Sequence, residues 1–269
     1  DVCSSDLISD GISLGILIDE FFKLYHGEEL EEMDLQYKDY AGWQRNLMEE
    51  GMIKEQKEYW LDRFSGQISV LDLPTDYDRG RKQGFEGESI DFKFDPVLVR
   101  KLEKLARTTG TTTYMILLSG LNILLSRYTG QEDIIIGSPT AGRSHPDLEK
   151  VIGMFVNTLA MRNRPNGNKR YDQFLSEVKK NVLSAYQNQD YQFEDLISNL
   201  DIDRNINRNP LFDVMLSMQT MLESLETEDI SLKPYPVDKG ISKFDFSIAV
   251  EQGEEEIKLE LNYNTGLFK

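Results

Sequence analysis

The chain has 269 residues, with 30 Lys and Arg against 47 Asp and Glu, so its formal net charge is −17. This charge argues against a general nucleic-acid binder, because phosphate contacts need a basic face. No apolar run reaches the ~18 residues that a membrane span requires. One cysteine, Cys3, excludes an intramolecular disulfide and a cysteine-based zinc cluster, and two histidines, His26 and His145, exclude a histidine-rich metal site. We therefore expect a cytoplasmic protein without a bound metal, and without a nucleic-acid or membrane partner.

The first part of the chain is predicted to be helical. Apolar residues recur at helical spacing over residues 13–25, so we expect an amphipathic helix that Ser13 caps and that ends beside His26 and Gly27. A second helical region is predicted over residues 35–64. The segment 71–82 is rich in Pro, Gly and charge, and we expect it to cross the surface between two lobes, residues 1–75 and 76–269.

The second part alternates predicted strands with helices. Apolar and polar residues alternate over residues 90–94, which predicts a strand, and Asp95-Pro96 then begins a helix that Gly110 ends. Further helices are predicted at 114–128 and 174–186. Further strands are predicted at 133–137, 155–161, 212–218, 244–250 and 257–263, the last two as a hairpin. This mixture predicts an α/β or α+β fold with two lobes.

A literal Gly-x-Ser-x-Gly motif occurs at residues 11–15. In a serine hydrolase the serine would lie on a sharp strand-to-helix turn. Residues 7–10 are too short and polar for a central strand, and no histidine follows His145 to complete a triad. A helix-capping role for Ser13 is the better interpretation.

Four polar or mixed segments could carry chemistry, although each alone is typical of a turn, a capped loop or a core strand. Residues 137–143 read Gly-Ser-Pro-Thr-Ala-Gly-Arg, and residues 151–162 read Val-Ile-Gly-Met-Phe-Val-Asn-Thr-Leu-Ala-Met-Arg. Residues 188–194 read Asn-Gln-Asp-Tyr-Gln-Phe-Glu, and residues 204–213 read Arg-Asn-Ile-Asn-Arg-Asn-Pro-Leu-Phe-Asp. Residues 137–143 are not a P-loop, because the Gly-Lys-Ser/Thr ending is missing.

In their order and spacing these segments resemble the late motifs of condensation domains from nonribosomal peptide synthetases. Residues 37–43, Tyr-Lys-Asp-Tyr-Ala-Gly-Trp, resemble an earlier motif, and residues 8–11 resemble the end of the active-site motif His-His-x-x-x-Asp-Gly. The resemblance covers nearly all of residues 8–269. It implies a fold of two chloramphenicol-acetyltransferase-like lobes, of which the second is nearly complete and the first mostly missing, so the chain looks truncated at both ends.

The resemblance also implies an activity: peptide-bond formation between a donor thioester and an acceptor amine, both on carrier proteins. Phosphopantetheine would arrive on these carrier domains, so no cofactor is bound to the chain itself. The adjacent adenylation domain of the same synthetase is the other implied partner. Asp10 and Gly11 would end the active-site motif, and Asp10 would pair with Arg143 to support the site. The implied substrate-binding residues are Ser138, Thr140, Asn157, Thr158, Gln189 and Asp190.

The chain departs from the family pattern at the two motif histidines. Their positions are occupied by Ser5 and Asp6, and a carboxylate, whose ordinary pKa is ~3.9, cannot replace imidazole beside an amine. The chain as written is therefore expected to be inactive, although its parent is an enzyme. A non-catalytic relative that binds carrier proteins or another enzyme is the alternative.

Overall fold

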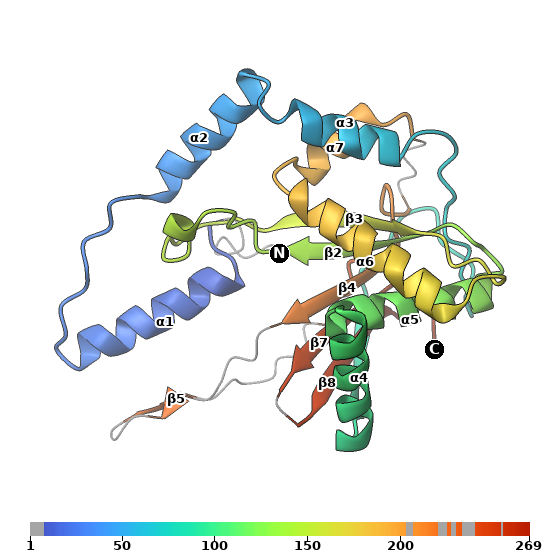
Figure 1. The fold of residues 1–269 in the computed structure, drawn as a ribbon. Coiled ribbons are helices and arrows are strands. Elements are labelled where there is room, and N and C mark those ends of the chain that lie inside the picture. The colour runs from blue at the N-terminus through green and yellow to red at the C-terminus, as the bar shows by residue number, and fades with distance from the viewer. Residues whose placement is uncertain (1–7, 203–206, 220–224, 227–229, 233–239, 254) are drawn as a thin grey trace. The chain divides into compact units, whose positions relative to one another are not determined.

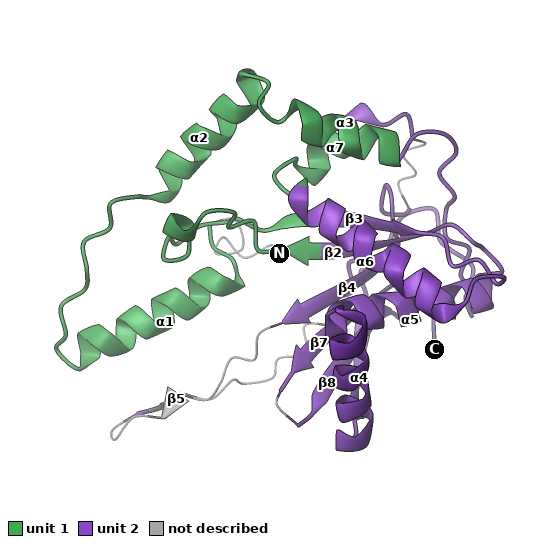
Figure 2. Cartoon of the chain, in the orientation of Figure 1, with its two compact units in different colours: residues 1–63, 139–158, 188–198 green, residues 64–138, 159–187, 199–269 purple. Residues whose placement is uncertain are grey.

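The computed structural model describes residues 8–202, 207–219, 225–226, 230–232, 240–253 and 255–269. The chain divides into two compact units, which Figure 2 distinguishes by colour. Unit 1 contains residues 1–63, 139–158 and 188–198, and unit 2 contains residues 64–138, 159–187 and 199–269. Each unit therefore assembles segments that are far apart in the sequence. The lobe boundary after residue 75 stays a prediction.

Unit 1 is mainly helical (Figure 1). Its helices are α1 (Gly11–Tyr25), α2 (Tyr37–Glu49), α3 (Lys54–Arg63) and α7 (Phe193–Asn199), with a 3-10 turn at Pro146–Leu148. The second predicted helical region is confirmed as two helices, α2 and α3. Helix α7 begins inside a segment that the sequence indicated as a loop.

The N-terminus of α1 differs from the prediction. The cap is Asp10 and not Ser13, because the Asp10 carboxylate accepts a hydrogen bond of 2.8 Å from the Ser13 backbone N–H. The C-terminus matches the prediction, since His26 is the C-cap and its Nδ1 lies 2.8 Å from the Phe22 carbonyl oxygen. The predicted apolar stripe is present but largely exposed, with Leu14, Leu17 and Phe21 at 45%, 54% and 57% exposure.

A six-stranded mixed sheet, in the order β1-β8-β7-β4-β2-β3, dominates unit 2. Strand β1 pairs antiparallel with β8, and β8 pairs antiparallel with β7, which confirms the predicted hairpin. Strand β4 is parallel to both β7 and β2. The strands are β1 (Gly87–Phe94), β2 (Ile134–Thr140), β3 (Asn157–Asn163), β4 (Val214–Gln219), β7 (Phe246–Gln252) and β8 (Ile257–Asn264); β5 (Leu225–Glu226) and β6 (Ser231–Leu232) form a separate pair.

Three helices of unit 2 pack in succession: α4 (Pro96–Thr109) on α5 (Thr113–Thr129), and α5 on α6 (Tyr171–Gln187). Helix α4 has the predicted ends, with Asp95 as N-cap and Gly110 in the left-handed conformation at φ +61°. Helix α5 is buried over most of its surface, as its apolar composition predicts. Two of its buried polar side chains, Ser119 and Asn122, donate to backbone carbonyls of the same helix at 2.7 and 2.8 Å, whereas Asn122 Oδ1 is buried without a hydrogen-bond partner among the described residues.

Four strand boundaries differ from the prediction. Strand β2 continues to Thr140, so the predicted loop after residue 137 begins three residues later. The strands predicted at 155–161, 212–218 and 244–250 each begin two residues later than expected. Among the described residues, no helix is both long enough and apolar enough to cross a bilayer.

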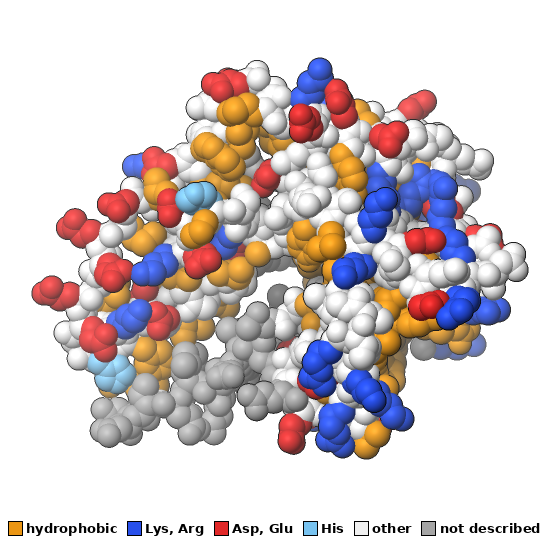
Figure 3. All heavy atoms as spheres, in the orientation of Figure 1, with side chains coloured by type: hydrophobic (Ala, Val, Ile, Leu, Met, Phe, Trp, Pro, Cys, Tyr) orange, Lys and Arg blue, Asp and Glu red, His pale blue; other side chains and the backbone are white. Residues whose placement is uncertain are grey.

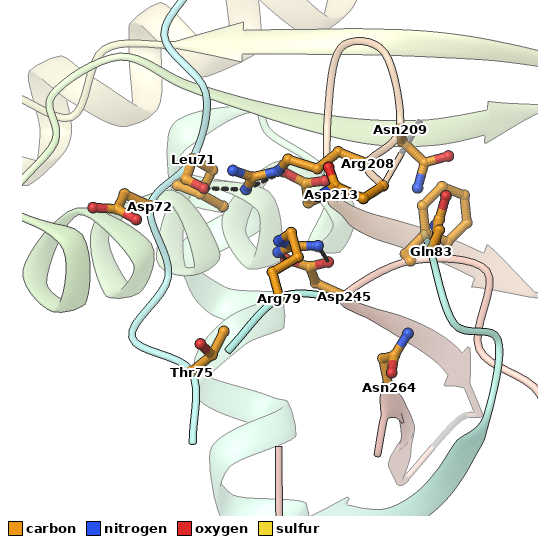
Figure 4. A network of polar contacts seen from close by, with 12 residues as sticks. Leu71, Asp72, Thr75, Arg79, Gln83, Arg208, Asn209, Asp213, Asp245 and Asn264 are labelled. Carbon is orange, nitrogen blue, oxygen red and sulfur yellow. Dashed lines mark hydrogen bonds and ion pairs between the residues drawn. The ribbon is translucent and has the colours of Figure 1, made fainter. Parts of the chain in front are cut away.

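A four-charge cluster ties the crossing segment to the sheet of unit 2 (Figure 4). Asp213 and Asp245 directly precede the parallel strands β4 and β7. Both guanidinium Nη atoms of Arg79 bond the Asp245 carboxylate, and Arg208 Nη2 donates to Asp213 Oδ2 at 2.7 Å. Arg208 also reaches the carbonyl oxygen of Leu71 at 2.5 Å. The two arginines therefore fix residues 71–79 against the N-terminal ends of neighbouring strands.

Burial raises the pKa of Asp213, and the nearby charge of Asp245 raises it further, against the opposing effect of Arg208. We predict that Arg208→Ala lowers the free energy of unfolding by about 3–5 kcal/mol, because it leaves the Asp213 carboxylate buried without its partner. Arg164→Ala is the matched control, since Arg164 is exposed and 4.0 Å from Asp133. Urea titration followed by tryptophan fluorescence measures both. Equal losses in the two variants would contradict the role of the cluster.

Candidate functional site

The Asp10 carboxylate lies at the centre of a hydrogen-bonded cluster in unit 1. Its Oδ1 accepts hydrogen bonds of 2.8 Å from both the backbone N–H and the hydroxyl of Ser13. Its Oδ2 accepts a hydrogen bond of 3.2 Å from the Phe155 backbone N–H. The Asp10 side chain is only 1% exposed, so it is removed from water almost completely. A carboxylate this buried is stable only when its oxygens are paired, and here both of them are.

Arg143 supplies the opposite charge. Its Nη2 lies 3.1 Å from Asp10 Oδ1, and its side chain is 4% exposed. The Nη1 atom donates to the carbonyl oxygens of Leu148 and Val151 at 2.5 and 2.6 Å. The guanidinium also lies over the ring of Phe155, 4.1 Å from the centroid. One arginine therefore joins the start of α1 to residues 148–155. The pairing that the family resemblance implied is present.

Ser13 completes this cluster, and sequence analysis missed that role. Its hydroxyl oxygen accepts from Arg143 Nη2 at 2.9 Å and from the Gly153 backbone N–H at 3.0 Å. Its single proton is shared between Asp10 Oδ1 at 2.8 Å and the Gly153 carbonyl oxygen at 2.9 Å. A hydroxyl with all its bonding capacity used inside the protein is not an exposed nucleophile. The geometry agrees with the rejection of a hydrolase motif at residues 11–15.

Two glycines allow chain segments to pack closely around the Asp10–Arg143 pair. Gly142 has φ +65°, and a Cβ there would lie 1.8 Å from the Phe155 carbonyl oxygen. A Cβ at Gly153 would lie 2.1 Å from the ring of Tyr37. The glycine before Arg143 in residues 137–143 is therefore required by space and by conformation. This requirement was invisible in the sequence, because the contacting atoms come from segments distant in the chain.

Aromatic rings cover the pair on one side. The rings of Phe155, Tyr37 and Tyr40 contact one another, with centroid distances from Phe155 of 5.1 Å to Tyr37 and 4.6 Å to Tyr40. Tyr37 also donates from its hydroxyl to the Met154 carbonyl oxygen at 2.7 Å. Burial raises the pKa of Tyr40 to about 12, assisted by the charge of Asp190. Tyr40 therefore stays neutral and supplies no charge to the cluster at neutral pH.

The pKa of Asp10 is held below its ordinary value. Burial by itself would raise that pKa, but the hydrogen bonds from Ser13 and Phe155 and the charge of Arg143 together outweigh burial. The carboxylate is therefore ionised at neutral pH. A group that is already ionised, paired and enclosed cannot deliver a proton, and its low pKa makes it a weak base.

A second cluster in unit 1 joins the start of β3 to residues 188–193. Asn157 Nδ2 donates to the carbonyl oxygens of Gln189 and Tyr191 at 2.7 and 3.0 Å. Its Oδ1 accepts from the backbone N–H groups of Thr158 and Phe193 at 2.8 and 3.2 Å. All four bonding positions of this amide are thereby used within the protein. Asn157 therefore holds the start of β3 against residues 189–193, and we call this arrangement the Asn157 clamp.

Other predicted substrate residues lie around that clamp. The hydroxyl of Thr140 donates to Gln189 Oε1 at 2.6 Å. Asp190 Oδ2 accepts from Gln56 Nε2 at 3.0 Å, and Gln56 in turn accepts from the Asp190 backbone N–H at 3.0 Å. Gln56 was not singled out from the sequence, and a lone glutamine on a polar helix carries no signal of such a role.

The remaining predicted residues are placed separately. Gly11 is the first residue of α1 and is exposed, whereas Thr158 is half-buried in β3. Ser138 is buried in β2 within unit 2, so it is not part of the unit 1 clusters. Ser5 and Asp6 lie outside the described residues, as does the start of the 204–213 segment. In the part of the chain that the structure describes, no group of three His, Cys, Asp or Glu side chains could hold a metal ion.

Comparison with known proteins identifies the family of this chain. The family model described as "Condensation domain" matches residues 7–269. The chain belongs to the condensation domain family. It is 48% identical over 264 residues to bacitracin synthase 3 of Bacillus licheniformis and 47% identical to tyrocidine synthase 3 of Brevibacillus parabrevis. Each alignment covers 98% of this condensation domain but only 4% of the relative's length.

Solved structures show the same fold. A four-domain nonribosomal peptide synthetase, holo-AB3403 bound to AMP and glycine, matches 97% of this chain over 21% of its own, with a TM-score of 0.87 at 22% identity. The first condensation domain of the calcium-dependent antibiotic synthetase, in complex with a substrate analogue, matches 98% of this chain over 58% of its own. Its TM-score is 0.72 at 16% identity. The mixed α/β fold predicted from the sequence, of the chloramphenicol-acetyltransferase-like kind, is confirmed.

The buried ion pair predicts a large effect of removing the arginine. Arg143→Ala leaves the ionised Asp10 enclosed and two backbone carbonyls unpaired, so we expect a loss of about 3–5 kcal/mol in the free energy of unfolding. Lys150→Ala is the control, because the Lys150–Glu31 pair spans 2.8 Å between exposed side chains and such pairs contribute roughly 0–1 kcal/mol. Denaturant titration measures both. A loss in Arg143→Ala no larger than in the control would contradict the structural role of the pair.

The low pKa of Asp10 predicts an acid-dependent contribution to stability. Because the folded-state pKa is depressed, this contribution is complete above the unfolded-state value of about 4 and disappears as pH falls through the folded-state pKa. The difference in unfolding free energy between the wild type and Asp10→Asn should therefore be largest at neutral pH and shrink below pH ~4. Asp172→Asn, on an exposed side chain, is the control. A difference for Asp10→Asn that stays constant down to pH ~2 would contradict the assignment.

Proposed function

We propose that this condensation domain serves in the formation of an amide bond between two carrier-bound substrates. The donor is an aminoacyl or peptidyl thioester, and the acceptor is an amine on a second carrier protein. The family match over residues 7–269 supports this proposal. The Asp10–Arg143 pair carries it, because it joins the end of the active-site motif to the Ala-Gly-Arg segment.

The reaction is an acyl transfer. The acceptor nitrogen attacks the thioester carbonyl carbon, a C–N bond forms, and the C–S bond breaks. The nitrogen loses one proton, and the departing thiolate of the donor carrier gains one. The cost of bringing two tethered substrates together is reduced by holding them in a fixed orientation, which is what a rigid site contributes.

Within this proposal, Asp10 and Arg143 are positioning residues. Asp10 caps α1, and Arg143 holds residues 148–151. In our proposal the pair therefore fixes the end of the active-site motif against residues 148–151 and does not contact the reacting atoms. The clamp at Asn157 fixes residues 189–193 in the same manner. Thr140, Thr158, Gln189, Asp190 and Ser138 remain our candidates for contacts with substrate.

The partners follow from the chemistry. Phosphopantetheine arrives covalently attached to carrier domains, and we propose that these and an adenylation domain of the same synthetase, in the cytoplasm, are the partners. No metal or nucleotide enters the proposed step. The chain itself provides the support for both substrate arms.

A non-catalytic role is the second candidate, favoured by one observation. The positions of the two motif histidines hold Ser5 and Asp6. Without imidazole, the amine loses the group that would position it or accept its proton. The domain would then bind carrier proteins without joining their substrates.

Amide formation in the synthetase that carries this domain tests the proposal. The donor and acceptor carriers are loaded, and the carrier-bound product is followed by mass spectrometry. We predict that Ser5→His and Asp6→His together raise the rate of product formation ~10²–10⁴-fold above that of the unrestored chain. Arg143→Lys in the restored protein should lower the rate, because lysine cannot reproduce the forked contacts.

Two results would contradict this account. Restored histidines without any product, in a protein that still binds loaded carrier, would support the non-catalytic role. Product formation in the unrestored chain at the restored rate would show that imidazole is not needed, and our interpretation of positions 5 and 6 would be wrong.

A further inference from the structure

The charge of this chain is distributed very unevenly. Residues 96–130 and 159–187 contain eleven Lys and Arg against three Asp and Glu, whereas the rest of the chain contains 19 against 44. These two segments therefore carry a net charge of +8 in a chain of −17. They hold α4, α5 and α6, which all belong to unit 2.

The excess of positive charge lies on the outer surface of these helices. Figure 3 shows Lys and Arg side chains gathered over α4 and along α6. Arg162 is buried against Asp133, but the other ten cations are exposed or half-exposed. We call six of them the basic layer: Arg100, Lys101, Lys104 and Arg107 of α4, and Lys179 and Lys180 of α6.

The two helices bring these cations together. A Cβ placed on Gly110, the C-cap of α4, would lie 3.1 Å from Lys179 Nζ, so α6 reaches the end of α4. Lys179 there complements the carbonyl end of the α4 dipole, and we assign it a structural role. Arg107 is 3.8 Å from Glu103, on an exposed side chain. Lys101, Lys104 and Lys180 form no ion pair with any described residue.

Apolar side chains are exposed beside these charges. Leu183 is 48% exposed and Tyr186 is 37% exposed, both on α6. Leu183 lies three residues after Lys180 and three before Tyr186, so the three share one face of the helix. Protein interfaces combine an apolar centre with a charged or polar rim, whereas a purely solvated face carries charge alone. This face has both components.

We propose that the basic layer, together with Leu183 beside Lys180 on α6, is a docking surface for an acidic face of a carrier-protein domain. The inference rests on the proposed function, and it specifies where one partner binds. Complementary charge accelerates encounter and fixes the orientation of a complex. The phosphodiester of phosphopantetheine adds a further negative charge to such a partner. A nucleic acid fits less well, because the remainder of the chain carries −25 and would repel an extended polyanion.

The test measures binding of a phosphopantetheine-loaded carrier-protein domain from the same synthetase, by calorimetry at low and at near-physiological salt. The triple variant Lys101→Glu, Lys104→Glu and Lys180→Glu should raise Kd at least about tenfold at low salt and flatten its salt dependence. The matched control reverses three exposed cations elsewhere, Lys38→Glu, Arg81→Glu and Lys82→Glu, and should stay within about twofold of the wild type.

A third variant separates the apolar contribution. Leu183→Ala should raise Kd about three- to tenfold without changing the salt dependence, because it removes contact area and no charge. Circular dichroism and thermal unfolding confirm that each variant is folded. The substituted residues lie outside the clusters around Asp10 and Asn157, so we expect these two clusters to keep their structure in every variant.

Several results would overturn the docking surface. These are no binding of the carrier domain to the wild type, equal weakening by the patch and control variants, or binding only to a duplex DNA probe. Self-association of the wild type that the patch variant abolishes would assign the layer to a second copy instead. Amide formation without carrier binding at the basic layer would reject the docking surface and leave the proposed function intact. Carrier binding at the layer without amide formation rejects catalysis and leaves the docking surface intact.

Discussion

The local geometry of unit 1 depends on one buried ion pair. Asp10 and Arg143 are separated by more than a hundred residues, yet their side chains are almost fully withdrawn from water. Such a pair is costly to desolvate and is stable only when its remaining hydrogen-bonding positions are filled. Ser13, Phe155 and two backbone carbonyls fill most of them, and Arg143 Nε is left without a hydrogen-bond partner in the described part of the chain. Because these partners belong to the start of α1, to Arg143 and to residues 148–155, the arrangement specifies the path of three chain segments and not merely their proximity.

Local signals predicted the elements that local physics controls. Asp95, Pro96 and Gly110 define α4 by capping and by backbone conformation, and the alternation in 257–263 predicted β8. The errors arose where tertiary contacts decide. Ser13 has the chemistry of a helix cap, but Asp10 three residues earlier takes that place and leaves the serine hydroxyl for Arg143. Strand β2 extends to Thr140 within a sequence of Gly and Pro that favours a loop.

The same difference between local signals and tertiary contacts applies to the candidate site. The Asp10–Arg143 pair could be expected only through the family resemblance, since nothing within either segment points to the other. The need for glycine at 142 and the role of Gln56 depend on atoms that distant segments contribute. Charge segregation was also hidden by the overall value of −17, because the basic residues of α4 and α6 emerge as one surface only when the helices are packed. Composition therefore limits the partner class but does not locate its binding surface.

The most direct measurement is a double-mutant cycle between Asp10 and Arg143. Unfolding free energies are determined for the wild type, Asp10→Asn, Arg143→Gln and the double variant. If the two charges form one unit, the losses are strongly non-additive, and we predict a coupling energy above about 1.5 kcal/mol. The coupling should fall as pH drops below ~4, where the carboxylate is protonated. Additive losses, with coupling below about 0.5 kcal/mol, would contradict the central place of this pair in the structure.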